Sequence, residues 1–519
     1  MKERIEAYFK AGYPAVYIVS AEEQRVEDMV KSITQTVPVG KPVRNLVWSS
    51  VTGVIDLSGE TPKFEDCRSP DEAVDLLIGL DEPAVLLLRD IHAYLGDDAD
   101  PVLVRHFREA LRTLKTDGTA AKMLLFCGPV LNLPPELERE MPVLDLPLPS
   151  KEELAGMVRT LCAHNNLPEP DADLMDRLVG AAGGLTSLEA ENALAISVVQ
   201  TGRPDPAVLA REKAQTLRKS GVLEIVDPGR SLDDVGGLDL LKGWIRKRRR
   251  AFGQAARDFG LPIPRGLLIL GLPGCGKSMT ARATASSLGV PLLRLDMGRI
   301  FGSLVGQSEQ RIREAIQIAE AISPCCLWVD EIDKGVAGSQ GGQTDGGTAA
   351  RVLGTLLTWM QEKDSPVFVV ATANNPWMLP APLVRKGRFD ELFYVDLPTA
   401  DERREIWNIH LRRYAPKARL GEATVKVLAD KSQGLTGSEI EACVTEALST
   451  AFDEEADGLA YEHLQAALAD CTPLSKTMAG ELSKIREWVG GRARPASSAQ
   501  PGGLPTGGRR VITTQQSLN

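Results

Sequence analysis

The sequence predicts an α/β protein built on parallel sheets, and three observations support this prediction. Short apolar runs, such as residues 266–270 and 366–373, have the length and composition of buried parallel strands. A glycine-rich loop at residues 271–278 joins the first run to a stretch that reads as a helix and stops at Gly289. With 519 residues, the chain is also too long for one ordinary core, so two or three domains are expected.

The loop after the first run has the composition of a P-loop. It reads Gly-Leu-Pro-Gly-Cys-Gly-Lys-Ser from Gly271 to Ser278. Its glycines let the backbone turn tightly, so successive N–H groups can face phosphate, and the helix that follows adds its N-terminal dipole. We expect Lys277 to reach the β- and γ-phosphates and the Ser278 hydroxyl to bind Mg²⁺. The alternative is a chance glycine turn, which the strand before it and the Lys-Ser after it disfavour.

Three further elements carry side chains suited to phosphoryl transfer. Two adjacent acids end an apolar strand, where Asp330 would hold magnesium and Glu331 would orient or deprotonate a water molecule. Asn374 ends the next strand and offers an amide to a phosphate or to that water. Arg385 and Arg388 lie three residues apart and suit stabilisation of charge on a transferring phosphoryl group. Taken alone, these elements could equally be solvated strand ends, an ordinary turn and a basic surface turn.

Residues from about 230 to 472 resemble an AAA ATPase module of the AAA+ superfamily, a P-loop NTPase with a parallel sheet core and a helical lid. The resemblance begins at residues 233–238, similar to the segment that lies against adenine in that clade. It implies that Asn374 is the first sensor and His410 a lid histidine near the base, and that 434–439 form the second sensor region. The implied nucleotide-binding residues are Val235, Gly236, Gly271, Leu272, Pro273, Gly274, Cys275, Gly276, Lys277, Ser278, Met279, His410, Gly437 and Ser438.

The sequences of residues 330–335 and 357–363 resemble one branch in particular, the poorly characterised AAA proteins of algal chloroplast genomes, cyanobacteria and other bacteria. The resemblance implies ATP and Mg²⁺ as ligands. It also implies that Arg385 and Arg388 act as arginine fingers on a neighbouring copy's nucleotide. Such sharing needs a head-to-tail contact, which gives a ring if the rotation closes, and a hexamer is the family expectation.

One departure from the pattern of the family affects the predicted function of the protein. AAA unfoldases usually carry an aromatic residue in the first pore loop, where this chain has Leu304-Val305-Gly306. An aromatic side chain grips peptides through its large contact area, so its absence weighs against polypeptide threading. The glycine-rich residues 338–347 read either as a mobile pore loop or as a surface insertion. We therefore weigh a ring that remodels or regulates an unknown protein partner against an ATP-dependent assembly switch or scaffold.

Composition sets the outer limits of function. A hydrophobic content of 43% with 25% charged residues is typical of soluble globular proteins, and no apolar run approaches the length of a membrane span. Eight scattered cysteines indicate a reduced protein of the cytoplasm, or of the plastid stroma if plastid-encoded. Five unclustered histidines make a zinc site unexpected. The net charge of −10 disfavours general nucleic-acid binding. Five cations at 246–250 keep a nucleic-acid-linked ATPase open as an alternative to a solvated or ring-interface patch.

The first half of the chain is predicted to be a degenerate copy of the same module. Asp-Leu-Pro precedes Gly-Leu-Thr by 39 residues at Asp145 and by 38 residues at Asp396, and the glutamates that follow match in register. In place of the glycine loop, however, the first strand runs into residues 20–24, whose two carboxylates would repel phosphate. His92 is expected where the catalytic glutamate would stand. Coincidence among short motifs is the alternative.

The predicted organisation follows from these motifs. We expect a degenerate N-terminal module at 1–205, with a core at 1–149 and a helical lid at 150–205. A helical linker at 206–228 leads to the ATPase core at 229–398 and its lid at 399–474. A short helix and a tail complete 475–519, and disorder is expected from Gly490 because that stretch is rich in Gly, Pro, Ser, Gln and Thr.

Overall fold

The protein was analysed as a computed structural model, which describes most of the chain. The described residues are 1–36, 42–58, 63–96, 99–116, 120–252, 256, 258–301, 307–334, 346–385, 387–416, 418 and 420–499. The chain divides into two compact units, Met1–Leu209 and Ala210–Asn519, and each is described by itself. Among the described helices, none combines the length and hydrophobicity that crossing a bilayer requires.

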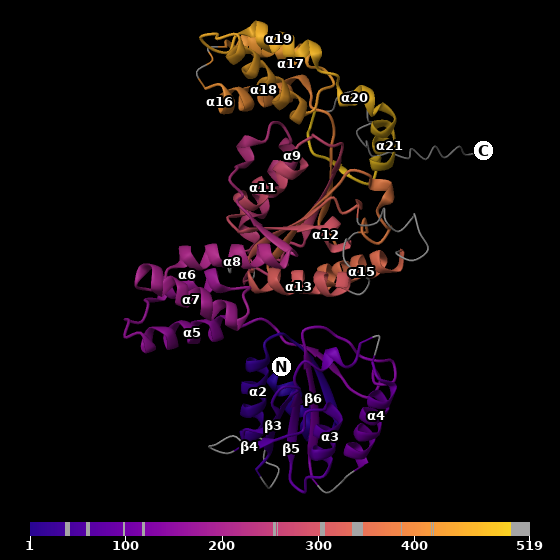
Figure 1. The fold of residues 1–519 in the computed structure, drawn as a ribbon. Coiled ribbons are helices and arrows are strands. Elements are labelled where there is room, and N and C mark those ends of the chain that lie inside the picture. Colours follow the sequence, from indigo (N-terminus) through magenta and orange to yellow (C-terminus); the bar gives the residue numbers. More distant parts are fainter. Residues whose placement is uncertain are drawn as a thin grey trace, which may run out of the picture. The chain divides into compact units, whose positions relative to one another are not determined.

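The first unit alternates strands and helices before it becomes all-helical (Figure 1). Its elements are α1 (Lys2–Lys10), β1 (Ala15–Val19), α2 (Glu23–Thr36), β2 (Arg44–Ser49), β3 (Gly53–Asp56), β4 (Lys63–Glu65), α3 (Pro70–Ile78), β5 (Ala84–Leu88), η1 (Ile91–Ala93), α4 (Pro101–Thr116), β6 (Lys122–Gly128), β7 (Val143–Asp145), α5 (Lys151–His164), α6 (Ala172–Ala182) and α7 (Ser187–Thr201). A further helix, α8 (Pro206–Ser220), crosses the boundary between the units.

The sheet of the first unit is sandwiched between helices because its strands are apolar on both faces. The strand order is β4-β3-β2-β5-β6-β1-β7, in which β2, β5, β6, β1 and β7 run parallel. Tyr17 of β1 packs with Phe107 of α4, whereas the next residue, Ile18, packs with Val30 of α2 on the other face. Figure 1 accordingly shows α2 on one side of the strands and α3 and α4 on the other.

The second unit repeats this plan. Its elements are β8 (Leu223–Val226), η2 (Leu232–Asp234), α9 (Asp239–Arg248), η3 (Arg249–Phe252), β9 (Gly266–Gly271), α11 (Lys277–Leu288), β10 (Leu292–Asp296), α12 (Met297–Phe301), α13 (Gln307–Ala321), β11 (Cys325–Asp330), α15 (Gly346–Glu362), β12 (Val367–Ala373), η5 (Pro376–Met378), β13 (Glu391–Val395), α16 (Ala400–Tyr414), α17 (Glu422–Lys431), α18 (Gly437–Asp453), α19 (Tyr461–Asp470), α20 (Leu474–Thr477), α21 (Ala479–Val489) and β14 (Arg494–Pro495).

The two sheets share one topology. In the second sheet the order is β14-β13-β9-β12-β11-β10-β8, so its five parallel strands β10, β11, β12, β9 and β13 follow the same sequence of neighbours as β2, β5, β6, β1 and β7. Helices α9 and α11 lie on one side of this sheet and α13 and α15 on the other (Figure 1). The fold class predicted from the sequence, a P-loop α/β module preceded by a degenerate copy, is therefore confirmed.

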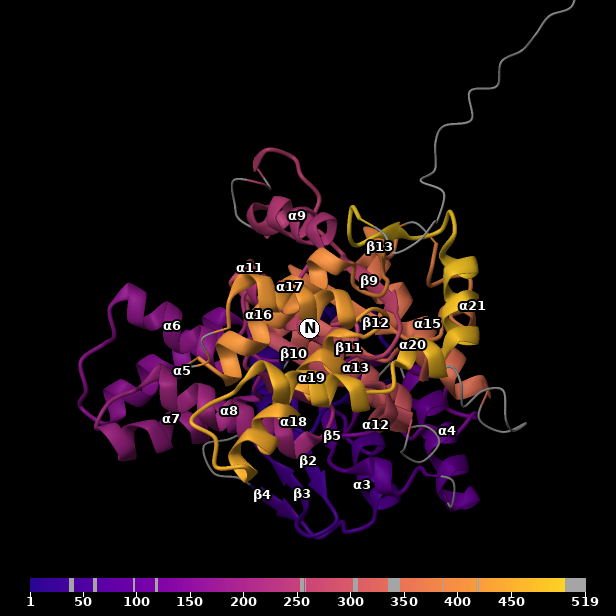
Figure 2. The same ribbon diagram turned by 90° about the horizontal axis from the view of Figure 1, so that it is seen from above.

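Helices α16–α19 lie together as a helical lid (Figure 2). The lid has its own core around Trp407, Leu428 and Val444. The third lid helix of each unit, α7 in the first and α18 in the second, begins at the Gly-Leu-Thr motif for the same reason. Thr436 accepts a hydrogen bond from Glu439 N at 3.3 Å, and Thr186 accepts one from Glu189 N at 3.3 Å. These are capping boxes, which satisfy backbone donors that a helix start leaves free.

Two segments differ from the expectation. Residues 206–228 were predicted as a linker, but β8 within them pairs antiparallel with β10 and extends the second sheet. Disorder was predicted from Gly490, but residues 490–499 are structured, and Arg494-Pro495 pair with β13 as strand β14. Composition misled the prediction there because the main-chain pairing partner, β13, lies far earlier in the sequence.

Candidate nucleotide site

The glycine loop lies where the sequence predicted, between β9 and the N-terminus of α11. Gly274 and Gly276 have φ of 79° and 87°, left-handed conformations that favour glycine. A Cβ on Gly274 would lie 2.9 Å from the Thr436 hydroxyl, so this position has no room for a side chain. The loop is thus held open as a turn whose backbone N–H groups are free to face an anion at a helix N-terminus.

Lys277 is buried at the base of this loop. Its Nζ donates to the carbonyl oxygens of Gly271 at 2.8 Å and Leu272 at 2.7 Å. Burial lowers the pKa of the Lys277 ammonium to about 8, although nearby carboxylates, Asp333 first among them, oppose the shift. A desolvated cation of this kind fits a bound phosphate chain, because an anion there would offset the remaining cost of burying the charge.

Neighbouring side chains hold the two predicted acids. Asp330 Oδ1 accepts from the Thr372 hydroxyl at 2.8 Å, and its Oδ2 lies 3.2 Å from Arg294 Nη2. Glu331 has φ of 48° and its Oε1 accepts from Asn374 Nδ2 at 3.2 Å. The register of the strands thus brings Glu331 and Asn374 together across β11 and β12, as ends of adjacent parallel strands.

Lys334 is a partner of Glu331 that the sequence analysis did not include. Its Nζ lies 2.5 Å from Glu331 Oε2, and that hydrogen bond raises the pKa of Lys334. Both side chains are more than a third exposed, so water screens this ion pair. In the sequence, only the spacing of three positions between Glu331 and Lys334 suggested this contact.

Asp333 is a second residue that sequence reasoning missed. It is 1% exposed, and its Oδ2 accepts from Asn374 N at 3.2 Å, Asn375 N at 2.9 Å and Asn375 Nδ2 at 3.1 Å. A buried carboxylate with three donors fixes the turn that carries the Asn374 amide. Its spacing of two residues from Glu331 was visible in the sequence, but nothing there showed its burial.

A pocket beside the loop collects most of the predicted base-side residues. Its walls are residues 234–236 and Leu238, the loop residues 274–276 with Met279, the end of β13, and lid residues of α16 and α18. Ser438 joins lid to loop, because its N and Oγ donate to the Gly274 carbonyl at 3.2 and 3.3 Å. Of the predicted nucleotide-binding residues, this pocket brings together Val235, Gly236, Gly274, Cys275, Gly276, Met279, His410, Gly437 and Ser438.

His410 forms part of the lid wall of this pocket and is buried. Burial lowers its pKa, which the Glu441 carboxylate opposes from 3.8 Å. The ring stacks on Tyr414 with centroids 6.2 Å apart and planes 9° from parallel. At neutral pH His410 therefore presents an uncharged aromatic ring, which suits a flat heterocycle.

Arg385 and Arg388 lie apart from this pocket. They line a separate hollow with Arg265 and Gln361, and Arg388 Nη1 donates to the Pro382 carbonyl. Arg385 is exposed. Within the described chain, neither guanidinium takes part in the contacts of Lys277 or Glu331 given above.

The first unit lacks the corresponding loop. Three residues, Ser20–Glu22, separate β1 from α2, whereas five, 272–276, separate β9 from α11. Glu22 fills the place of an anion: its Oε1 accepts from Ser187 N at 2.5 Å, at the N-terminus of the third lid helix, α7. Arg25 bonds Glu22 at 3.2 Å and both oxygens of Glu153 at 3.1 Å, which joins α2 to the first lid helix.

Strand register corrects the prediction for His92. Leu88 pairs with Phe126 as Val329 pairs with Ala371, at the same position in both sheets. The residue at the position of Glu331 is therefore Asp90, not His92, and its φ of 49° matches the 48° of Glu331. The place of Asp330 is taken by Arg89, which pairs with Glu27. A cation cannot hold magnesium, so the first unit lacks the chemistry of the second.

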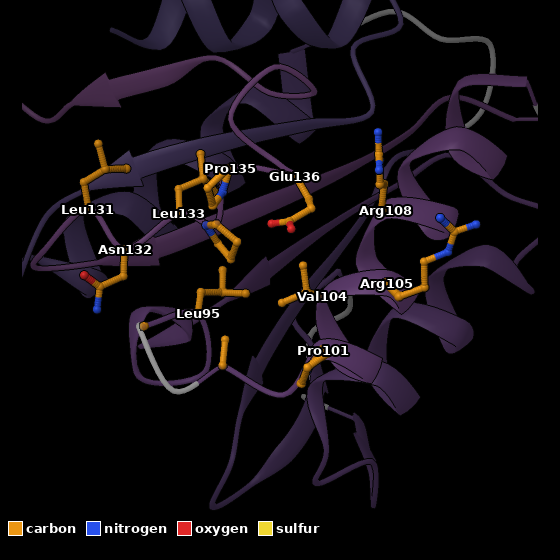
Figure 3. A pocket seen from close by; sticks show the side chains of 13 residues that line it. Leu95, Pro101, Val104, Arg105, Arg108, Leu131, Asn132, Leu133, Pro135 and Glu136 are labelled. Carbon is orange, nitrogen blue, oxygen red and sulfur yellow. The ribbon is translucent and has the colours of Figure 1, made fainter.

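A hollow of roughly 640 Å³ also lies in the first unit (Figure 3). Its lining does not include the vestigial loop; the lining residues are Leu95, Gly96, Ala99, Pro101, Val104, Arg105, Arg108 and residues 131–136. Figure 3 shows Glu136 near its middle, with Arg105 and Arg108 of α4 to one side. Both arginines are paired, with Glu109 at 2.7 Å and Glu140 at 3.8 Å.

Part of the basic run at 246–250 is used inside the second unit. Arg246 pairs with Asp233 at 3.0 Å, and the Arg248 guanidinium lies 3.5 Å from the centre of the Trp244 ring. Arg246 thus helps to seat α9 beside Asp233, whereas Arg248 covers a ring of its own helix. Two other predicted features, Leu304-Val305-Gly306 and most of the glycine-rich residues 338–347, lie outside the described residues.

A parallel sheet with a glycine loop after its first strand, and paired acids after its third, defines a nucleotide-binding domain of the P-loop class. Comparison with known families agrees. Residues 267–397 match the family described as ATPase family associated with various cellular activities (AAA). Residues 1–146 match the N-terminal domain, and residues 152–220 the second domain, of SpoVK-like AAA ATPases.

Individual relatives cover nearly the whole chain. It is 36% identical over 495 residues to the uncharacterized AAA domain-containing protein ycf46 of Guillardia theta, spanning 94% of this chain and 95% of that protein. The ycf46 protein of Pyropia yezoensis is 36% identical over 496 residues, 94% and 97% of the two chains. A cell division cycle protein 48 homolog of Archaeoglobus fulgidus is 30% identical over 283 residues, 53% of this chain and 38% of that one. The chain belongs to the AAA ATPase family, and specifically to the ycf46 group of AAA domain-containing proteins.

Proposed function

We propose that the second unit binds ATP with Mg²⁺ at residues 271–278 and hydrolyses its terminal phosphate. The observation that carries this proposal is the juxtaposition of Glu331 and Asn374, 3.2 Å apart, at the strand ends beside the phosphate loop. Glu331 orients or deprotonates the attacking water, and the Asn374 amide fixes the Glu331 carboxylate. Lys277 neutralises the β- and γ-phosphates.

The donor set near the loop fits a hard divalent cation. Ser278 is exposed at the first turn of α11, and Asp330 stands at the end of β11 with one oxygen on Thr372. Hydroxyl and carboxylate oxygens are the ligands that Mg²⁺ prefers. When bound, the ion supplies positive charge to the phosphate oxygens. Ser278 and Asp330 would hold it.

The arginines are assigned to a neighbouring copy. Arg385 and Arg388 line their own hollow away from the loop, which supports their action across a head-to-tail contact. Such a contact repeated around an axis gives a ring, and six copies is the expectation for this family. Arg388→Ala copies should then be rescued partly by mixing with Lys277→Ala copies, since each supplies what the other lacks. Mixtures without any gain in turnover would count against a shared site.

The ATPase cycle is proposed to remodel or regulate a macromolecular partner, in the cytoplasm or the plastid stroma. An alternative is an assembly switch without threading, favoured by Leu304 and Val305 where an aromatic residue would be expected. Substituting these two residues separates the functions, because a motor would lose substrate processing while a switch would assemble normally.

A nucleic-acid-linked ATPase is the third candidate function. It fails if DNA and RNA leave the turnover rate unchanged at low salt.

The direct test of hydrolysis is Glu331→Gln. The variant keeps the loop and Lys277, so it should bind ATP with near-normal affinity while turnover falls at least about a hundredfold. Asp364→Asn, an exposed acid of the same unit, is the matched control and should behave as wild type. Near-normal turnover of Glu331→Gln would remove Glu331 from its assigned role.

A further inference from the structure

The C-terminal segment, residues 479–499, returns from the lid to the core of the second unit. After α21 the chain pairs Arg494-Pro495 with β13 and adds a strand to the edge of the sheet. Ala496 is 1% exposed, and its N donates to the Tyr394 carbonyl at 2.8 Å. The segment is therefore seated in the core, next to elements that build the nucleotide pocket.

Helix α21 holds the junction between core and lid. Arg486 donates from Nε to one oxygen of Asp396 at 3.0 Å and from Nη2 to the other at 2.9 Å. Asp396 lies between β13 and α16 and lines the nucleotide pocket. A two-pronged bond of this kind fixes orientation as well as distance.

Residues 496–498 hold two further walls of the same pocket. The Ser497 hydroxyl donates to Glu402 Oε1 at 2.5 Å, and that oxygen also accepts from Leu238 N at 3.3 Å. Ser498 N donates to Asp239 Oδ1 at 2.8 Å, and the Ala496 carbonyl accepts from Leu241 N at 3.0 Å. Glu402 of the lid and Leu238 beside α9 both line the pocket, and Ser497 secures them through one carboxylate.

Leu238 shows why such support is needed. Its φ of 56° is a left-handed conformation that costs a non-glycine residue about 1–3 kcal/mol. Bonds on both sides of it hold that conformation, since Leu238 N donates to Glu402 Oε1 and the Asp239 carboxylate accepts from Ser498 N. Without the C-terminal segment, Glu402 loses the hydrogen bond from the Ser497 hydroxyl, and Asp239 loses the one from the Ser498 N–H.

We propose that the C-terminal segment is a positioning element for the base-binding walls of the ATP site, so that residues 494–498 set nucleotide affinity without touching the nucleotide. The inference rests on the proposed ATP site. Its physical basis is preorganisation: walls held in the binding conformation lose less entropy when the base enters. The phosphate loop makes none of these contacts, so phosphate binding is independent of the segment.

The test compares two truncations of the full chain. A chain ending at Ala499 keeps every contact described and should bind ADP as the full chain does. A chain ending at Ala493 should bind ADP about tenfold more weakly, the effect of losing one bond to a charged group. Affinity for inorganic tripolyphosphate, which has no base, should stay within about twofold. Equal ADP affinities, or equal weakening for both ligands, would overturn the proposal.

Point variants keep the test decisive if the shorter chain does not fold. Ser497→Ala should weaken ADP about threefold, and Ser497→Thr should restore binding because it keeps the hydroxyl. Ser483→Ala is the matched control, since Ser483 is an exposed serine of α21 whose hydroxyl donates to the Ala479 carbonyl of its own helix. ADP affinity unchanged in Ser497→Ala would reject the role of Ser497. A full chain that binds no ADP at all refutes the ATP site itself, and the inference falls with it.

Discussion

Removing the Asp333 carboxylate should disable hydrolysis without emptying the nucleotide site. Three N–H donors end on one oxygen of this buried acid, at 2.9 to 3.2 Å. Asp333→Ala leaves them without an acceptor, at about 1–3 kcal/mol each. Because the turn can partly relax toward water, we expect a net loss of about 3 kcal/mol in the free energy of unfolding of the second unit.

The consequence for turnover follows from Asn374. Its backbone N–H is one of the three donors, and its amide holds Glu331 at 3.2 Å. Once that turn moves, we expect turnover at saturating ATP and Mg²⁺ to fall about a hundredfold, the scale of a lost general base. ADP affinity should change less than about threefold, because none of these bonds involves the phosphate loop.

The assay combines ATP turnover, ADP calorimetry and thermal unfolding of the full chain. Asp333→Asn keeps one acceptor oxygen and should fall between wild type and Asp333→Ala. Asp364→Asn should leave all three measurements unchanged. A folded Asp333→Ala protein whose turnover lies within about threefold of wild type would refute the positioning role of Asp333.

Three other predictions concern the loop and the first unit. Without nucleotide, the folded second unit buries a charged Lys277 below pH 8, which costs it roughly 3 kcal/mol because the pKa of the ammonium is lowered from 10.5 to about 8. Between pH 8 and 10.5 the folded state releases this proton while the unfolded state keeps it, so stability should rise with pH across this window relative to Lys277→Met; parallel pH profiles of the two proteins' unfolding midpoints would contradict this. Gly274→Ala should abolish ADP binding, because the φ of 79° and the Thr436 hydroxyl leave no room for a Cβ. The control is Gly243→Ala in α9, where a Cβ meets no atom within 4 Å, and this variant should bind ADP normally. Glu22→Gln weakens the bond from Ser187 N, so it should destabilise the first unit by about 1–2 kcal/mol and leave ATP turnover intact. Glu191→Gln, exposed on α7, is the control, and lost turnover in Glu22→Gln would show that the first unit takes part in hydrolysis.

Local patterns in the sequence predicted the centre of the site. The loop at 271–278, the acids after β11 and the amide after β12 each follow an apolar strand, and parallel strands bring their carboxyl ends together. The duplicated fold was also predictable, because order and spacing of short motifs survived in the first half. These signals are local, so one sequence is enough to see them.

Contacts between distant segments could not be predicted in this way. His92 was assigned to the wrong position because a motif count ignores strand register, which shows that Asp90 of the first unit is equivalent to Glu331 of the second. Burial of Asp333 depends on a turn that comes much later in the chain. The composition after Gly490 predicted a disordered tail. Ala496 and Ser497 are ordered through hydrogen bonds to β13 and α16, and composition does not reveal such partners.

Counting the nucleotides bound by each chain tests the account most directly. Calorimetric titration of the purified, folded protein with ADP and Mg²⁺ should give one site per chain, lost in Lys277→Ala and retained in Glu22→Gln. Uptake of two nucleotides per chain would contradict the vestigial first unit. No uptake at all would contradict the proposal that the second unit is an ATPase.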